Sequence, residues 1–76
     1  MIGKSEQRAL RAALKDCREI EINLRVREWE VTITTAPASG AWKQDMIARV
    51  YARKPWTESS QWCASVEEII DSLRRL

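Results

Sequence analysis

The stretch ARVYARKPWTESSQW, residues 48–62, interleaves basic and aromatic side chains and is the part of the chain best suited to binding. Single-stranded nucleic acids lie on such surfaces, because phosphates meet the cations and bases stack on the rings. Arginine and aromatic side chains are also the usual anchors of protein–protein interfaces. Alternatively, Tyr51 only shields the sheet and Trp56 folds back over the core. The candidate partner-binding residues are Arg49, Tyr51, Arg53, Lys54 and Trp56.

A second basic surface is predicted near the N-terminus. Its members recur at intervals of three and four residues, which places them on one face of a helix. Such a stripe could lie against phosphates or against an acidic protein surface. The alternative is a solvated helix face on which Lys15 pairs with Glu19. The residues of this surface are Arg8, Arg11, Lys15 and Arg18.

Other chemistry is largely excluded by composition. The chain has no histidine, which removes histidine-assisted nucleophiles, histidine metal ligands and the usual general base near neutral pH. Its two cysteines are too few for a zinc site, and Cys17 is expected to be a small buried side chain. Glu67, Glu68 and Asp71 fit the capping of a helix better than acid–base catalysis. We therefore expect no enzyme, no catalytic residues, no metal and no cofactor.

Hydrophobic periodicity predicts two helices and three strands. Ser5 is a suitable N-cap for the first helix, and Ser65 with Glu68 has the spacing of a capping box before the last. Residues 20–26 could extend the first helix, but their alternation of β-branched residues favours a strand. The predicted elements are helix 5–19, strand 20–35, strand 42–54, strand 60–64 and helix 66–76.

The strand over residues 20–35 needs a special feature near its middle. Its apolar residues fall on even positions up to Val26 and on odd positions from Trp29 onward. A flat strand would expose one of the two sets. We predict a bulge near Arg27 and Glu28, which adds one residue and restores a single buried face. The alternative, two strands with a sharp bend, lacks the usual turn residues.

The expected fold is α+β, with a three-stranded antiparallel meander and both helices packed on one face. This α-β-β-β-α order is similar to that of the double-stranded-RNA-binding domain. In that family the last helix begins with basic residues that meet phosphates. The equivalent stretch here, SVEEII, is acidic and would repel them, so that function is not carried over.

Size and charge indicate how such a chain acts. Its 76 residues form one small domain, 1–76, with little room for an enclosed ligand pocket. The net charge of +2 is far from that of a dedicated nucleic-acid binder. No apolar run resembles a signal peptide or a membrane span, so a cytoplasmic location is expected and no membrane partner.

The sequence therefore predicts a non-enzymatic inhibitor or adaptor that occludes or bridges a larger protein. Proteins of this size are frequent in bacteriophages and mobile elements. Two alternatives stay open: a nucleic-acid binder that uses the basic and aromatic sheet face, and a homodimer formed through an exposed strand edge.

Overall fold

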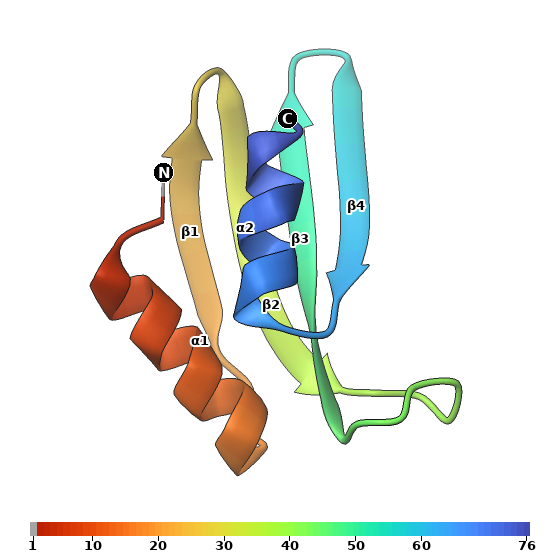
Figure 1. Ribbon diagram of the computed structural model, residues 1–76. Helices are drawn as coiled ribbons and strands as arrows, with labels where there is room; N and C mark the ends of the chain where they lie inside the picture. The colour runs from red at the N-terminus through yellow and green to blue at the C-terminus, as the bar shows by residue number, and fades with distance from the viewer. Residues whose placement is uncertain (1) are drawn as a thin grey trace.

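The computed structural model describes residues 2–76, which form two helices and four strands (Figure 1). The strands pair antiparallel in the order β1–β2–β3–β4, and both helices lie on the same face of the sheet (Figure 1). The predicted α+β class is confirmed, but the sheet has four strands and not three. The elements are α1 (Lys4–Asp16), β1 (Glu21–Val26), β2 (Trp29–Pro37), β3 (Met46–Lys54), β4 (Thr57–Cys63) and α2 (Val66–Arg74).

The segment predicted as one bulged strand, 20–35, is instead a hairpin of two strands. Val26 pairs with Trp29, and Arg27 and Glu28 between them form a two-residue turn. Such a turn sends the residues on either side of it to the same face, so it explains the change from even to odd apolar positions without a bulge. The order is therefore α-β-β-β-β-α, which differs from that of the double-stranded-RNA-binding domain.

The other predicted strands also change their limits. The third strand starts at Met46 instead of residue 42, because residues 40–45 form a loop that the Ala38 N–H closes on the Asp45 carbonyl at 2.8 Å. The last strand starts at Thr57 instead of residue 60 and ends at Cys63. Its polar TESS segment reads as a loop in the sequence, yet it pairs with β3 along its whole length.

The first helix is shorter than predicted at its C-terminal end. It stops at Asp16, because Cys17 takes a left-handed conformation with φ 55° and its N–H bonds the Ala13 carbonyl. This leaves Cys17 exposed, so the expectation of a buried thiol there is wrong. At the start, Gly3 and not Ser5 is the N-cap, and its N–H donates to a Glu6 carboxylate oxygen at 2.9 Å.

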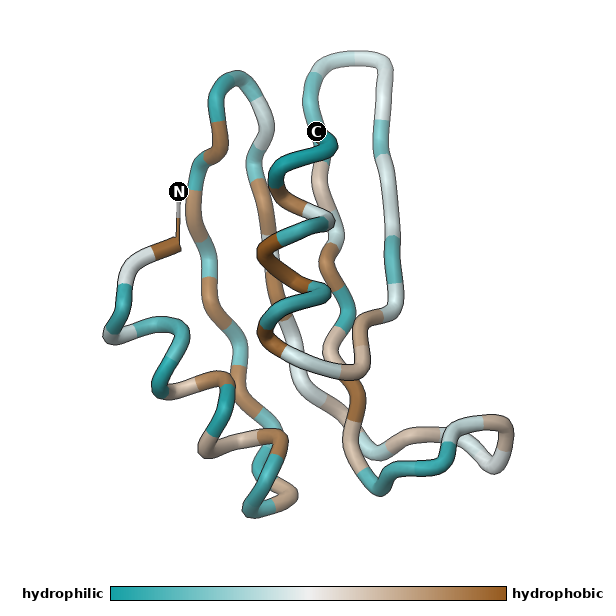
Figure 2. Tube along the Cα trace, viewed as in Figure 1, coloured by the Kyte–Doolittle hydropathy of each residue, from teal (hydrophilic) through white to brown (hydrophobic). Residues whose placement is uncertain are grey.

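The core lies between the helices and the covered face of the sheet. Leu10 of α1 and Ile69 and Leu73 of α2 are fully buried against this face, to which Ile33 of β2 contributes at its centre. The inward residues predicted for β3 are all buried: Met46, Ala48, Val50 and Ala52. Figure 2 shows the result, since hydrophobic colour gathers on α2 and on β1 to β3 and is scarce along β4.

The entry into α2 follows the predicted capping spacing. The Ser65 hydroxyl accepts a bond from the Glu68 N–H at 3.2 Å, while the Glu68 carboxylate accepts from the Ala64 N–H at 2.9 Å. The preceding residue, Cys63, is buried, and burial raises the pKa of its thiol to about 11. Neither of the two cysteines forms a disulfide. No helix within residues 2–76 has the length and apolar character needed to span a bilayer.

Candidate binding surface

The sheet face opposite the helices carries three rows of side chains, with one residue from each strand in every row. These side chains point away from the helices because they alternate with the buried ones along each strand. We call these twelve residues the open face. The rows are Glu21, Thr34, Arg49 and Trp62; then Asn23, Thr32, Tyr51 and Ser60; then Arg25, Glu30, Arg53 and Glu58.

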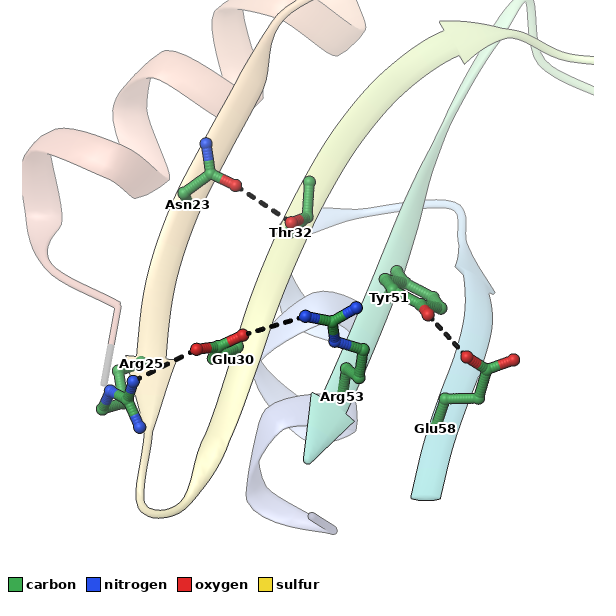
Figure 3. A network of polar contacts seen from close by, with 7 residues as sticks. All are labelled: Asn23, Arg25, Glu30, Thr32, Tyr51, Arg53 and Glu58. Atoms are coloured by element: carbon green, nitrogen blue, oxygen red, sulfur yellow. Dashed lines mark hydrogen bonds and ion pairs between the residues drawn. The ribbon is translucent and has the colours of Figure 1, made fainter. Parts of the chain in front are cut away.

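Polar contacts run within and between the rows of the open face (Figure 3). Glu30 lies between two arginines, 3.3 Å from Arg25 and 3.6 Å from Arg53. The Tyr51 hydroxyl donates to Glu58 at 2.6 Å, and because this bond favours the protonated phenol it raises the Tyr51 pKa. Exposed ion pairs of this kind contribute at most about 1 kcal/mol each, so their main effect is to hold side chains in place.

Arginine and aromatic side chains meet on the half of the open face that β3 and β4 form. The Arg49 side chain donates to the Ser60 hydroxyl at 2.9 Å, and its guanidinium lies 5.1 Å from the centre of the Tyr51 ring. Trp62 is the neighbour of Arg49 in the first row and is 55% exposed. Trp62 was not among the predicted site residues. Its alternation with buried Cys63 is the signal that places it here.

Three of the five predicted residues, Arg49, Tyr51 and Arg53, therefore lie together on the open face. Lys54 lies on the opposite side of β3. Its ammonium group is 4.5 Å from the centre of the Trp29 ring and 2.9 Å from a Glu28 carboxylate oxygen. The hydrogen bond from Lys54 lowers the pKa of Glu28. Lys54 thus connects the two hairpin turns and is not part of the open face.

The fifth predicted residue, Trp56, lies at the tip of the β3–β4 hairpin. Pro55 and Trp56 form its two-residue turn, in which Trp56 has φ 71°. Proline followed by a residue with positive φ is the pattern of a type II turn, whose third position is normally glycine or asparagine. Trp56 is also fully exposed, at 102% of its reference area. Its indole therefore stands in solvent on an unfavourable backbone.

A cleft of about 490 Å³ links the Trp56 turn to the open face. It is open to solvent and lies at the end of the sheet where the two hairpin turns stand side by side (Figure 1). The charged groups along it already pair with one another through the Glu28–Lys54 and Arg25–Glu30–Arg53 contacts. The lining residues are Arg25, Glu28, Glu30, Arg53, Lys54, Pro55 and Trp56.

The charges of the open face cancel. Three arginines, at positions 25, 49 and 53, stand among three glutamates, at positions 21, 30 and 58, so the formal sum is zero. Affinity for nucleic acid depends on cations that neutralise phosphates. The open face therefore presents no excess of positive charge to a phosphate backbone.

The second predicted surface is only partly assembled. Arg8, Arg11 and Lys15 lie along α1, but Arg18 follows the helix and lies 3.8 Å from Asp16. Arg11 is 2.7 Å from the Glu67 carboxylate of α2, and this hydrogen bond lowers the pKa of Glu67. The stripe therefore has one of its cations engaged by the neighbouring helix.

Within residues 2–76, no three histidine, cysteine, aspartate or glutamate side chains gather in a group that could hold a metal ion. No protein family, curated protein or solved structure matches this chain. Function is therefore inferred from the surface itself.

Proposed function

We propose that this chain is a non-enzymatic protein-binding module of the inhibitor or adaptor type. It would act by pressing the Trp56 turn and the adjoining open face against a larger protein, which it occludes or bridges. The observation that carries the proposal is the position of Trp56, a large apolar side chain that is fully exposed at φ 71°.

Trp56 is unfavourable for the isolated fold in two respects. A left-handed conformation costs an L-residue other than glycine roughly 1–2 kcal/mol. Its side chain recovers none of this by burial, since it is fully exposed. Exposed residues held in rare backbone conformations gather at functional sites, and tryptophan is the residue most enriched at binding hot spots. Contact with a partner would supply the burial that the fold does not.

The open face suits the same role because its side chains are already held in place. Arg49 and Tyr51 are fixed by hydrogen bonds to Ser60 and Glu58 across the β3–β4 pair. Side chains that are ordered before binding lose less conformational entropy when the complex forms. Together with Trp62, they place two aromatic rings and one guanidinium group on the open face, three of whose residues, Arg25, Glu30 and Arg53, line the cleft that leads to Trp56.

A protein partner is favoured over nucleic acid by the balance of charges on the open face. If phosphates were the target, affinity would fall by orders of magnitude as salt rises. An interface centred on aromatic side chains should weaken far less. A titration with mixed single- and double-stranded oligonucleotides at low salt separates the two, and tight, salt-sensitive binding there would overturn the protein-binding proposal.

The direct experiment begins with affinity capture from the native host and identification of the partner by mass spectrometry. Affinity of the purified partner is then measured for the wild type, Trp56→Asn and Tyr51→Ala. Loss of a hot-spot side chain costs about 2 kcal/mol or more, so we expect Trp56→Asn to bind at least about 30-fold more weakly. Arg8→Ala, on the helical side, is the control and should bind normally. Unchanged affinity in both sheet variants would show that another surface binds.

A further inference from the structure

The outer edge of β4 is unprotected. Six of its seven residues, Thr57 to Trp62, are exposed or partly exposed, and Cys63 alone is buried. Figure 1 shows α2 in front of β2 and β3, while β4 lies to one side of the helix with its outer edge uncovered. The strand has a single charged residue, Glu58, and no proline within it. Natural sheet edges are usually blunted by charges, prolines or bulges, because an open edge pairs with further strands.

The hairpin geometry identifies which backbone groups are free at this edge. Lys54 and Thr57 flank a hydrogen-bonded turn and form the first pair of the β3–β4 ladder. Bonded and non-bonded pairs alternate in an antiparallel ladder, so residues 57, 59, 61 and 63 bond to β3. Glu58, Ser60 and Trp62 therefore turn their N–H and C=O groups outward. The same rule applied from the Val26–Trp29 pair gives the observed bond from Thr35 N–H to Ile20 C=O.

We propose that β4 pairs antiparallel with β4 of a second copy, about a twofold axis that passes through Ser60. In this register Ser60 lies opposite Ser60 of the second copy, and Glu58 lies opposite its Trp62. The outward N–H and C=O groups of all three residues then find partners. The two open faces merge into one continuous surface, which a single copy does not offer.

The side chains of β4 are self-complementary in this register. Small hydroxyl groups meet at the axis, so no bulky or charged side chain faces its own copy there. The carboxylate of Glu58 lies beside the Trp62 indole of the second copy, and the two glutamates are kept apart. Trp62, 55% exposed in the single chain, gains a neighbour on its open side. The second copy thus adds Glu58 to the cluster of Arg49, Tyr51 and Trp62.

The opposite edge of the sheet is less suited to pairing with itself. In Figure 1, most of α1 lies to the outer side of β1, and the helix passes the strand only near its lower end. Two copies joined at β1 would bring their α1 helices together. Each of these helices carries four basic residues against Glu6 and Asp16, a formal charge of +2, and the two would repel one another. Among residues 2–76, no helix occupies the corresponding position beyond β4 (Figure 1).

Charge exchange at the axis tests both the edge and the register. Sedimentation equilibrium is measured over a dilution series for the wild type, for Ser60→Lys, for Ser60→Glu and for an equimolar mixture of the two variants. Like charges directly opposite one another weaken a strand pair, so each variant alone should dimerise roughly fivefold more weakly than the wild type. The mixture should recover or exceed wild-type association. A wild type that stays monomeric to about 1 mM, or a mixture no better than its components, would overturn the proposal.

Proline substitution supplies a matched control. Ser60→Pro removes one outward N–H from β4, and Asn23→Pro removes one from β1 in the same row of the open face. Both N–H groups face away from the neighbouring strand, so proline is tolerated at either edge. Loss of dimers in Ser60→Pro alone supports pairing at β4, whereas loss in Asn23→Pro alone would overturn it. If Ser60→Pro fails to fold by circular dichroism, the charge-exchange series decides.

Discussion

The two hairpin turns at one end of the sheet look alike but are used differently. Each has two residues, and each contains one non-glycine residue with positive φ: Arg27 at 54° and Trp56 at 71°. The Arg27 guanidinium donates to the main-chain carbonyls of Leu73, at 3.5 Å, and Leu76. Trp56 is fully exposed. The unfavourable backbone of the first turn is offset by tertiary contacts, while the Trp56 side chain makes no such contact with the rest of residues 2–76.

The difference separates a residue that serves the fold from one that does not. Arg27 places a positive charge at the C-terminal end of α2, where the helix dipole is negative, and so fastens the helix to the β1–β2 turn. Trp56 joins no two elements of the fold, because its side chain is fully exposed. A backbone strain that the fold does not use is a reason to look for function at that position.

Removing the Arg27 side chain should have the largest effect on stability. Arg27→Ala loses charge-assisted hydrogen bonds to the end of α2 but keeps a positive φ on an L-residue. We expect the free energy of unfolding to fall by about 1–2 kcal/mol in urea denaturation. Arg27→Gly relieves the backbone and should fall less. Equal stability of wild type and Arg27→Ala would mean that the two turns do not differ as described.

Pro55→Ala should have a smaller effect, confined to the second turn. Proline fixes the backbone of the position before Trp56 and reduces the entropy of the unfolded chain, so its loss should lower stability by about 0.5–1 kcal/mol. Thermal unfolding followed by circular dichroism would measure this. When Trp56 is also replaced by asparagine, which adopts a positive φ more readily, part of the stability lost in Pro55→Ala should be recovered. A more stable Pro55→Ala protein would show that proline does not favour this turn.

The Lys54–Glu28 contact between the two turns should have the smallest effect, a dependence of the free energy of unfolding on pH. Lys54 lowers the Glu28 pKa, so the ionised carboxylate stabilises the folded state. This contribution is complete above the ordinary pKa of a glutamate and is lost as the pH falls through the lowered value. The stability difference between wild type and Glu28→Gln should therefore shrink on acidification below about pH 4. A difference that does not change with pH would rule out this contribution.

The fold could be predicted from the sequence wherever one face of an element is buried. The alternation in β3 and the apolar stripe of α2 gave the correct faces, because burial imposes a period on the residues. The Arg27–Glu28 turn could not be recognised from local signals. Arg27 has a positive φ, and its side chain bonds to the C-terminal end of α2. That contact joins residues far apart in the sequence, so the local residue pattern does not reveal it.

The β4 strand was missed in part for a related reason. An edge strand that lies outside the helical layer has little to bury, so Thr57 to Ser60 show no hydrophobic alternation. The residues of the candidate site could be predicted only where they alternate along a single strand. Arg49, Tyr51 and Arg53 alternate along one strand and do share a face, whereas Lys54 has the opposite parity. Trp62 joins them through strand pairing, which is not local in the sequence.

The unfolding free energy of Trp56→Asn tests most directly whether Trp56 serves contact instead of folding. Urea denaturation followed by far-ultraviolet circular dichroism avoids the change in fluorescence that the substitution causes. Asparagine adopts the left-handed conformation readily, and the indole buries nothing, so we expect the variant to be more stable by about 0.5–1 kcal/mol. A loss of about 1 kcal/mol or more would mean that Trp56 belongs to the fold, contrary to what we propose.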